Sequence, residues 1–326
     1  MFNTFHFVDT LHQMGRIVVA SRSFARNPAL RAELTARYPD ATFTASAAVL
    51  GGAELIDLLR GHERAIVGLE KIDEAVLAQV PELRVISKYG VGLDGLDLDA
   101  MAARGVTLAW TGGVNKRSVS ELTLAFAIAL LHRLPESGAT LRAGTWQPLV
   151  GRQLTGRTVG IIGCGFVGQD LVRLLNPFEC RVLANDIRDY PEFYGANRVE
   201  PVTLDRLLAE SDIVTMHVPL DASTRGMIGR AELARMRKGA VLINAARGGL
   251  VDEAALEDAL TRGHLAGAAF DVFQLEPDAN PRLLALPTFL ATPHIGGSTA
   301  EAQLAMGRAA IDGLETARLV GGGWPV

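Results

Sequence analysis

TVGIIGCGFVGQDLVRLL, residues Thr158 to Leu175, is the stretch that decides the fold of this chain. Its first residues form an apolar run that predicts a buried strand, and its second half has the apolar spacing of a helix. Gly163, Gly165 and Gly168 stand between the two, in the order glycine-x-glycine-x-x-glycine. A strand that turns through glycines at this spacing into a helix opens a strand–helix–strand unit of a parallel sheet.

Each of these glycines has its own physical task. Gly163 permits the tight turn, Gly165 lets a pyrophosphate approach the backbone, and Gly168 lets the helix pack close to the strand. The helix N-terminus adds unpaired N–H groups and the positive end of the helix dipole, which attract phosphate. The pattern therefore predicts a dinucleotide site, the alternative being a glycine-rich turn without a ligand.

The next strand, RVLAND, ends in Asp186, which indicates the kind of dinucleotide. Asp186 stands 18 residues after Gly168, close to the expected spacing of about 20. Its carboxylate can accept hydrogen bonds from the adenosine ribose, and its charge would repel a 2′-phosphate. NAD is therefore favoured over NADP as the cofactor, although Arg188 nearby weakens that preference slightly.

Short apolar runs alternate with helical patterns along the chain and predict an α/β architecture. Several runs are continuously apolar, as expected for strands covered on both faces in a parallel sheet. The strand predictions are 16–20, 65–69, 84–88, 106–110, 158–163, 181–186, 212–218, 240–246, 268–273 and 289–293. The stretch 141–156, which contains glycine and proline, is interpreted as a connection into a new unit.

Length and composition limit the class of protein. A chain of 326 residues favours two domains. The formal net charge of −4 shows no basic excess, so nucleic acid is not an expected partner. The longest apolar run, Leu122–Leu131, is too short for a membrane span and predicts a buried helix. Residues 1–15 lack a signal-peptide pattern and only two cysteines occur, so a cytoplasmic protein is expected.

Polar side chains follow three successive strand predictions downstream of the glycine loop. Arg247 follows the first and His294 follows the third. Asp271 and Glu276 stand at the end of the second and in the loop after it. Because ligands of open α/β sheets lie beyond the carboxyl ends of strands, these side chains can converge near the nicotinamide. Taken singly, Arg247 could form a surface ion pair, Asp271 could cap a helix or turn, and Glu276 and His294 could be ordinary loop and turn residues. Taken together, the four side chains suit hydride transfer.

These motifs resemble the D-2-hydroxyacid dehydrogenase family, which includes D-3-phosphoglycerate dehydrogenases. The segments that carry the resemblance are GIIGCGFVGQDL, HVPLDASTRGMIG, LINAARGGLVDEAAL, GAAFDVFQLEP and TPHIGGST. Matching motifs run from about Lys88 to Thr299. The resemblance implies two doubly wound parallel sheets: a Rossmann-type NAD-binding domain, residues 112–296, inserted in a flavodoxin-like substrate domain, residues 1–111 and 297–326. It also implies that the helix at Ser120–Leu131 crosses between the domains and contributes to a homodimer.

The resemblance assigns roles to the catalytic set. His294 is implied to be the acid/base, Glu276 the carboxylate that pairs with it, and Arg247 the group that holds the substrate carboxylate and 2-oxo group. An adjacent carboxylate raises the pKa of an imidazole and orients its ring. A guanidinium offers planar, permanently charged donors that a lysine cannot match. The implied reaction interconverts a D-2-hydroxy acid and its 2-oxo acid by hydride transfer with NAD.

The same resemblance implies the remaining contacts, and no metal site is expected. The implied cofactor contacts are Gly163, Gly165, Phe166, Val167, Gly168, Asp186, Val218, Pro219, Ala245, Ala246, Arg247, Asp271, His294, Gly296 and Gly297. Asp271 is implied to accept from the nicotinamide carboxamide, and Gly296 and Gly297 to keep room beside His294. The implied substrate contacts are Lys88, Tyr89, Gly90, Val91, Gly92 and Arg247. Backbone N–H groups of this substrate loop can cradle a carboxylate.

The chain departs from the phosphoglycerate enzymes of the family, which carry arginines for the substrate phosphate. Here Lys88 stands in the substrate loop, and Glu70 would oppose a dianion if it faced the cleft. Lys88, with Lys116 and Arg117, nevertheless motivates the hypothesis of a second anionic group at the far end of the substrate. Two other functions stay open: a formate or phosphite dehydrogenase, and a dinucleotide-sensing binding protein similar to the C-terminal-binding corepressors.

Overall fold

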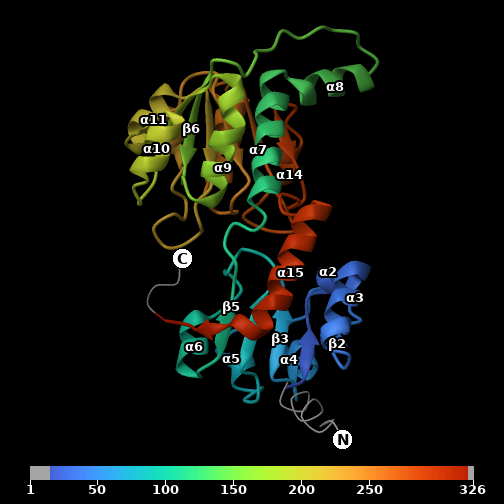
Figure 1. The fold of residues 1–326 in the computed structure, drawn as a ribbon. Helices are drawn as coiled ribbons and strands as arrows, with labels where there is room; N and C mark the ends of the chain where they lie inside the picture. The colour runs from blue at the N-terminus through green and yellow to red at the C-terminus, as the bar shows by residue number, and fades with distance from the viewer. Residues whose placement is uncertain (1–14, 322–326) are drawn as a thin grey trace, which may run out of the picture. The chain divides into compact units, whose positions relative to one another are not determined.

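The computed structural model describes residues 15–321. Residues 1–15, the stretch without a signal-peptide pattern, lie outside the described residues except for Gly15. The chain divides into two compact units, whose elements are labelled in Figure 1. The first unit combines the residues up to Asn115 with those from Ala300 onward, and the second unit runs Lys116–Thr299.

The first unit is built on a six-stranded sheet in the order β13-β5-β4-β3-β1-β2. Its strands are β1 (Ile17–Val19), β2 (Thr42–Phe43), β3 (Arg64–Val67), β4 (Val85–Lys88), β5 (Thr107–Ala109) and β13 (Arg318–Leu319). Five pair in parallel in the flavodoxin-like order, and β13 pairs antiparallel with β5. Its helices are α2 (Arg22–Arg26), α3 (Pro28–Arg37), α4 (Gly52–Leu59), α5 (Glu74–Leu77), α6 (Leu98–Ala103) and α15 (Ala300–Thr316).

The second unit is built on a seven-stranded, wholly parallel sheet in the order β12-β11-β10-β9-β6-β7-β8. Its strands are β6 (Thr158–Ile162), β7 (Arg181–Asn185), β8 (Val199–Pro201), β9 (Ile213–Met216), β10 (Val241–Asn244), β11 (Gly267–Phe270) and β12 (Phe289–Ala291). Its helices are α7 (Lys116–Leu131), α8 (Leu134–Arg142), α9 (Phe166–Leu175), the short η1 (Asn176–Phe178), α10 (Pro191–Asn197), α11 (Leu204–Glu210), α12 (Arg230–Arg235), α13 (Glu253–Thr261) and α14 (Pro281–Leu284). The prediction of two parallel α/β sheets, one of them Rossmann-like, is confirmed.

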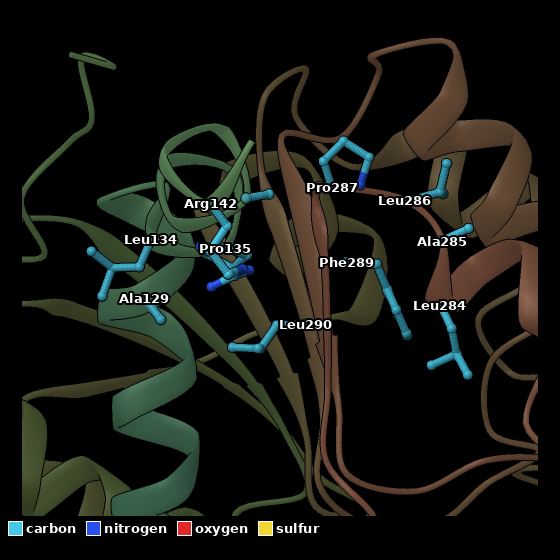
Figure 2. A pocket seen from close by; sticks show the side chains of 11 residues that line it. Ala129, Leu134, Pro135, Arg142, Leu284, Ala285, Leu286, Pro287, Phe289 and Leu290 are labelled. Carbon is cyan, nitrogen blue, oxygen red and sulfur yellow. The ribbon is translucent and has the colours of Figure 1, made fainter. Parts of the chain in front are cut away.

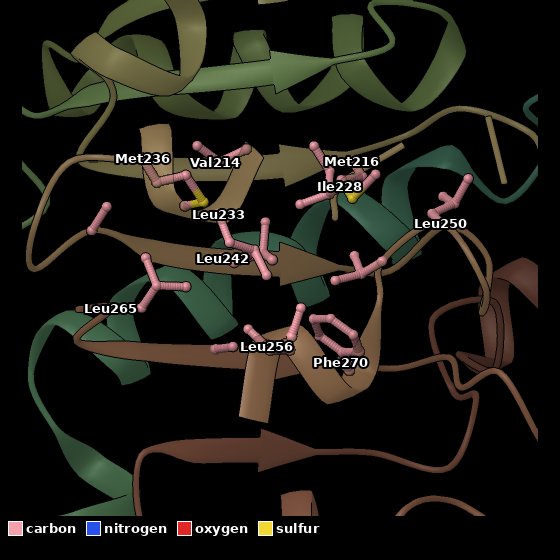
Figure 3. Packing of buried hydrophobic residues seen from close by; sticks show 14 of the residues in the cluster. Val214, Met216, Ile228, Leu233, Met236, Leu242, Leu250, Leu256, Leu265 and Phe270 are labelled. Atoms are coloured by element: carbon pink, nitrogen blue, oxygen red, sulfur yellow. The ribbon is translucent and has the colours of Figure 1, made fainter. Parts of the chain in front are cut away.

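Two hydrophobic layers cover the seven-stranded sheet, which explains its continuously apolar strands. Leu242 of β10 belongs to the layer formed with α11, α12, α13 and α14, whereas its neighbour Ile243 belongs to the layer formed with α7, α9 and α10. Figure 3 shows the first layer, with Leu256 of α13 and Phe270 of β11 among its labelled side chains. All four residues of β10 are buried, so neither face of the strand is exposed to solvent.

Three short strands and one connection differ from the sequence predictions. β2, β8 and β13 were not predicted, because two or three residues are too few to show a strand pattern. The stretch 141–156 was interpreted as a connection into a new unit, and this was wrong: it begins in α8 and lies wholly within the second unit. It lacks apolar periodicity because several of its apolar side chains are exposed.

Candidate active site

The glycine loop joins β6 to α9 at the point where the strand order of the second unit reverses. Gly163 has a φ of 91°, and a Cβ there would lie 2.7 Å from the carbonyl oxygen of His217. A Cβ on Gly168 would lie 2.4 Å from the carbonyl oxygen of Gly163, so the helix packs directly on the turn. A Cβ on Gly165, by contrast, would meet nothing within 4 Å. The loop is thus closed towards the protein and open at Gly165, where a pyrophosphate can approach.

Asp186 links the glycine loop to the turn after β7. Its Oδ2 accepts the backbone N–H of Cys164 at 2.6 Å, and its Oδ1 accepts the N–H of Arg188 at 2.8 Å. These bonds hold a partly exposed carboxylate beside the glycine turn, which fits hydrogen bonding to a ribose. Cys164 is buried, and burial raises the pKa of its thiol to about 12, so it is no nucleophile.

The loop after β9 completes this side of the site. The Val218 side chain would lie 2.8 Å from a Cβ on Gly163, so Val218 packs against the glycine turn. The carbonyl of Pro219 accepts from the hydroxyl of Thr224 at 2.8 Å. His217 precedes them, and burial lowers the pKa of its ring to about 3, which keeps that ring neutral. Phe166 is 54% exposed at the start of α9, so an apolar surface lies beside the open glycine.

His294 and Glu276 form the central contact of the site. Nδ1 of His294 lies 2.8 Å from Oε2 of Glu276. The hydrogen bond to Glu276 raises the pKa of His294, against the opposing effect of burial. Burial favours a higher pKa for Glu276, but hydrogen bonds from His294 and from the Phe273 N–H outweigh it and lower that pKa. The pair therefore favours a protonated imidazole beside an ionised carboxylate.

Asp271 holds the loop that presents His294. Its carboxylate accepts from the N–H groups of Ile295 and Gly296, both at 2.7 Å, and from the hydroxyl of Thr292 at 2.6 Å. His294 has a φ of 55°, a left-handed conformation that is uncommon for a residue with a side chain. The Asp271 carbonyl accepts the His294 N–H at 2.8 Å, so Asp271 braces this conformation through backbone and side chain.

Two sequence expectations about this loop need adjustment. Asp271 was expected to face the nicotinamide, yet its side chain is 1% exposed and bonded within the loop. Gly296 was expected to keep room for ligands, but a Cβ there would lie 2.9 Å from Oδ2 of Asp271. The glycine is thus required by the close approach of that carboxylate. The carbonyl of Gly296 also accepts from the Ser118 hydroxyl at 2.5 Å, which ties the loop to α7.

Arg247 stands in the loop after β10, which is shaped by a buried asparagine. Asn244 donates from Nδ2 to the Arg247 carbonyl at 2.8 Å, and its Oδ1 accepts the Ala246 N–H at 3.1 Å. The Arg247 guanidinium donates to the Ala246 carbonyl at 2.7 Å. A Cβ on Gly248 would lie 1.8 Å from the Phe273 carbonyl oxygen, so this loop lies directly against the turn that carries Glu276. The structure therefore brings the loops of Arg247, Glu276 and His294 together at one sheet edge.

The predicted substrate loop lies in the first unit, at the end of β4. The Tyr89 ring is buried and packs edge-on against Phe24 at 5.5 Å between centroids, so the backbone of this loop is the part available to a ligand. Gly90 has a φ of 126°, which only glycine adopts readily. Trp110 donates from its indole nitrogen to the carbonyl of Val91 at 2.7 Å and fixes the next part of the loop.

Lys88 differs from the expectation of a phosphate contact. Its side chain is buried and Nζ donates to the Gly68 carbonyl. Glu70 is 1% exposed and accepts the Gly68 N–H at 2.6 Å. Both charges are thus used on the backbone of one residue, Gly68 in the loop after β3, because strand β4 ends beside β3 in the sheet. Arg117 likewise donates to buried Asp170 at 3.0 Å, which joins α7 to α9.

Comparison with known proteins fits the class that this geometry defines, a dinucleotide-binding protein with an acid/base pair beside its nucleotide unit. Residues 124–296 match the family model described as "D-isomer specific 2-hydroxyacid dehydrogenase, NAD binding domain". The chain belongs to this D-isomer specific 2-hydroxyacid dehydrogenase family, whose model describes these residues as an NAD-binding domain, so the cofactor is NAD.

Three relatives illustrate the similarity. The chain is 40% identical over 250 residues to D-3-phosphoglycerate dehydrogenase of Mycobacterium bovis, covering 76% of this chain and 47% of that protein. It is 36% identical over 246 residues to hydroxypyruvate reductase of Thermotoga maritima, covering 73% and 78% respectively. Its fold matches a glyoxylate reductase structure from Paecilomyes thermophila with a TM-score of 0.84, at 25% identity over 93% and 95% of the chains. The chain spans about half the length of the phosphoglycerate dehydrogenases it matches.

Residues 15–321 contain no group of histidine, cysteine, aspartate and glutamate side chains arranged to hold a metal ion. Within the same range, no helix combines the length and apolar character that crossing a membrane requires.

Proposed function

We propose that this chain interconverts a D-2-hydroxy acid and its 2-oxo acid with NAD. The observation that carries the proposal is the 2.8 Å contact between His294 and Glu276 at the edge of the NAD-binding sheet. When bound, the cofactor would exchange the hydride with C2 of the substrate: NADH would supply it in reduction, and NAD would accept it in oxidation. Gly165, Asp186 and the N-terminus of α9 would hold its phosphates and ribose.

His294 moves the proton in this proposal. Because Nδ1 is bonded to the Glu276 carboxylate, Nε2 is the ring atom that exchanges a proton with the substrate oxygen. The protonated ring donates to the 2-oxo oxygen during reduction, and the neutral ring accepts the hydroxyl proton during oxidation. Arg247 binds the substrate carboxylate through its planar donors and places C2 for reaction. The backbone N–H groups of Tyr89 to Gly92, in the first unit, are proposed as substrate contacts as well.

The far end of the substrate is proposed to carry no phosphate. The sequence suggested Lys88 as a second anion contact, but its ammonium is buried and bonded to the Gly68 carbonyl. Glu70, which would repel a dianion, is buried and accepts the N–H of the same residue, Gly68. The hydroxypyruvate reductase and glyoxylate reductase among the similar proteins are named for unphosphorylated 2-oxo acids, whereas the phosphoglycerate dehydrogenases are named for a phosphorylated one.

NADH-dependent turnover of a panel of acids tests these proposals. Glyoxylate, hydroxypyruvate and pyruvate are compared with 3-phosphohydroxypyruvate, and formate and phosphite are assayed with NAD. We expect the highest kcat/KM for an unphosphorylated 2-oxo acid. Preference for 3-phosphohydroxypyruvate would reject the single-anion substrate. Turnover of formate or phosphite alone would reject the proposed reaction and favour a formate or phosphite dehydrogenase. NADH binding without any turnover would reject it and favour a dinucleotide-sensing binding protein.

A homodimer is also proposed, formed through α8 and the segment after it. Leu141, Trp146 and Val150 are exposed, Trp146 by 85% and Val150 by 90%. A groove of about 560 Å³ lies on the same unit between α7, α8 and the segment from α14 to β12, with Leu134, Leu286 and Leu290 among its lining side chains (Figure 2). An apolar segment and an apolar groove on one chain suit a second copy of that chain. Light scattering should give twice the chain mass, and Trp146→Ser with Val150→Ser should lower it.

A cytoplasmic location is the last part of the proposal. Cys164 and Cys180 are both free thiols, and Cys164 is buried inside the nucleotide-binding unit. Free thiols persist in a reducing compartment, which supports the cytoplasm. Cell fractionation that placed the protein in an oxidising compartment would overturn it.

A further inference from the structure

Glu253 occupies an unusual place for the first residue of a helix. It is the first residue of α13. The N-cap of this helix is Asp252, and the Asp252 side chain accepts from the N–H groups of Ala254 and Ala255 at 3.0 Å. Acidic residues in a first turn usually face water, yet Glu253 is only 8% exposed. Its Oε1 accepts the backbone N–H of Gln274 at 2.7 Å. The side chain therefore points from α13 to the turn that carries Glu276.

That turn is held by two carboxylates on consecutive N–H groups. The Phe273 N–H donates to Oε1 of Glu276 at 2.9 Å, and the next N–H, that of Gln274, donates to Glu253. Oε2 of Glu276 contacts His294. The Glu276 carboxylate is therefore held by the Phe273 N–H through Oε1 and faces the imidazole through Oε2. The Gln274 N–H and the Phe273 carbonyl belong to one peptide, so the bond to Glu253 fixes the orientation of that peptide, directly after the residue whose N–H donates to Glu276.

Little else fixes this turn on its outer side. Gln274 is exposed, and Leu275 is 66% exposed, so hydrophobic packing contributes little there. On the inner side the Phe273 carbonyl lies against Gly248, next to Arg247, where no side chain would fit. The Phe273 ring anchors the turn from within, packed against Phe270 and Phe289, and Glu253 holds it from outside by a hydrogen bond to the backbone. The positive end of the α13 dipole stabilises the Glu253 carboxylate in this buried place.

We infer that Glu253 is a positioning residue: it sets the Glu276 carboxylate against His294 without touching the substrate. The inference rests on the proposed function, in which His294 carries the proton. The charged groups that act on His294 are Glu276, Asp271 and Arg247, and of these only Glu276 sits on the turn that Glu253 holds. Loss of the Glu253 contact should therefore affect the protonation of His294 through Glu276.

The test compares Glu253→Leu with Glu253→Gln, which keeps an acceptor oxygen for the Gln274 N–H. Glu257→Leu is the matched control, because Glu257 lies on the same helix and contacts Asn280 and Arg282 instead. Reductase activity is measured across pH for each variant. Glu253→Leu should lower kcat by up to about 10²-fold, the cost of a small misplacement. It should also move the alkaline limit of activity to lower pH, with KM and NADH affinity unchanged. Glu253→Gln and Glu257→Leu should keep the native profile.

A second measurement makes the outcome independent of turnover. Titration of His294 followed by NMR gives the pKa of its imidazole directly in each variant. The inference predicts a lower pKa for His294 in Glu253→Leu than in the native protein. An unchanged His294 pKa in a folded Glu253→Leu variant would overturn it, as would an equal pKa loss in Glu257→Leu. Absence of turnover in the native protein would reject the proposed function while this titration still decided the role of Glu253.

Discussion

Nδ1 of His294 lies 2.8 Å from Oε2 of Glu276, although 18 positions separate the two residues in the chain. The contact follows from sheet register, because Phe270 at the end of β11 is paired with Ala291 at the end of β12. Loops that leave paired strand ends begin side by side. The hydrogen bond fixes the tautomer in which Nδ1 donates to the carboxylate, and it directs Nε2 to the proton exchange of the proposed reaction.

Replacing His294 should remove the chemistry and spare cofactor binding. His294→Ala is expected to lower kcat by about 10²–10⁴-fold, the usual contribution of a general acid. NADH affinity should stay near native, because the glycine loop and Asp186 are elsewhere on the sheet. Steady-state kinetics and a fluorescence titration check this, with exposed His132→Ala as the control. Unchanged kcat in His294→Ala would show that His294 is only a turn residue.

Replacing Glu276 should move the pH dependence. The hydrogen bond to Glu276 raises the pKa of His294, so reduction is fully supported below that pKa and is lost as pH rises through it. Glu276→Gln removes the negative charge, so the His294 pKa should fall. The alkaline limit of reduction and the acid limit of oxidation should both move to lower pH. Exposed Glu192→Gln should change neither limit, and a Glu276→Gln profile identical to the native one would contradict the pairing.

Asp186 should determine the choice of dinucleotide. A hydrogen bond to a charged group contributes about 1.5–3 kcal/mol, so Asp186→Ser should weaken NADH binding by roughly 10–100-fold. NADPH binding should weaken less or improve, because the repulsion of its 2′-phosphate is removed. Fluorescence titration with both reduced cofactors measures the ratio, and exposed Asp189→Ser is the control. Native binding of NADPH as tight as NADH would refute the assignment.

Gly248 should tolerate no side chain. A Cβ there would lie 1.8 Å from the Phe273 carbonyl oxygen, so Gly248→Ala must separate the Arg247 loop from the Glu276 turn. The expected loss of stability is about 1–3 kcal/mol, the usual cost of overpacking. Activity should fall as well, because both loops belong to the site. Gly195→Ala is the matched control, since a Cβ there meets nothing within 4 Å. Denaturant unfolding of both variants gives the comparison, and equal stability would reject the close approach.

Lys88 should affect stability and leave substrate selection alone. Lys88→Met leaves the Gly68 carbonyl without its ammonium donor, which should cost about 1–3 kcal/mol. The ratio of kcat/KM between hydroxypyruvate and 3-phosphohydroxypyruvate should stay constant, because Nζ is bonded inside the first unit. Lys71→Met, whose side chain is 77% exposed, should leave both quantities near native. A selective rise in KM for the phosphorylated acid in Lys88→Met would restore the second anion site.

The main features of the fold were readable from the chain because they depend on local patterns. Continuous apolar runs predicted the parallel strands, since strands buried on both faces have no solvent-exposed positions. The glycine spacing predicted the turn at Gly163, which has a φ of 91°. Strand β8 was not predicted because its three residues, one of them a proline, are too few to show a strand pattern. The residues proposed for catalysis were found because each follows a predicted strand.

The sequence by itself determined the sheet class, the glycine loop and which residue types stand at the strand ends, since all of these follow from spacing along one chain. Tertiary structure decided which partner each polar group meets. Lys88 was expected to contact an anionic group of the substrate, but parallel pairing of β3 and β4 puts its ammonium at the Gly68 carbonyl. Glu253 reads as an ordinary first-turn acid, but packing of α13 against the sheet turns it to the Gln274 N–H. Burial and hydrogen-bond partners depend on residues distant in the chain, which no local pattern specifies.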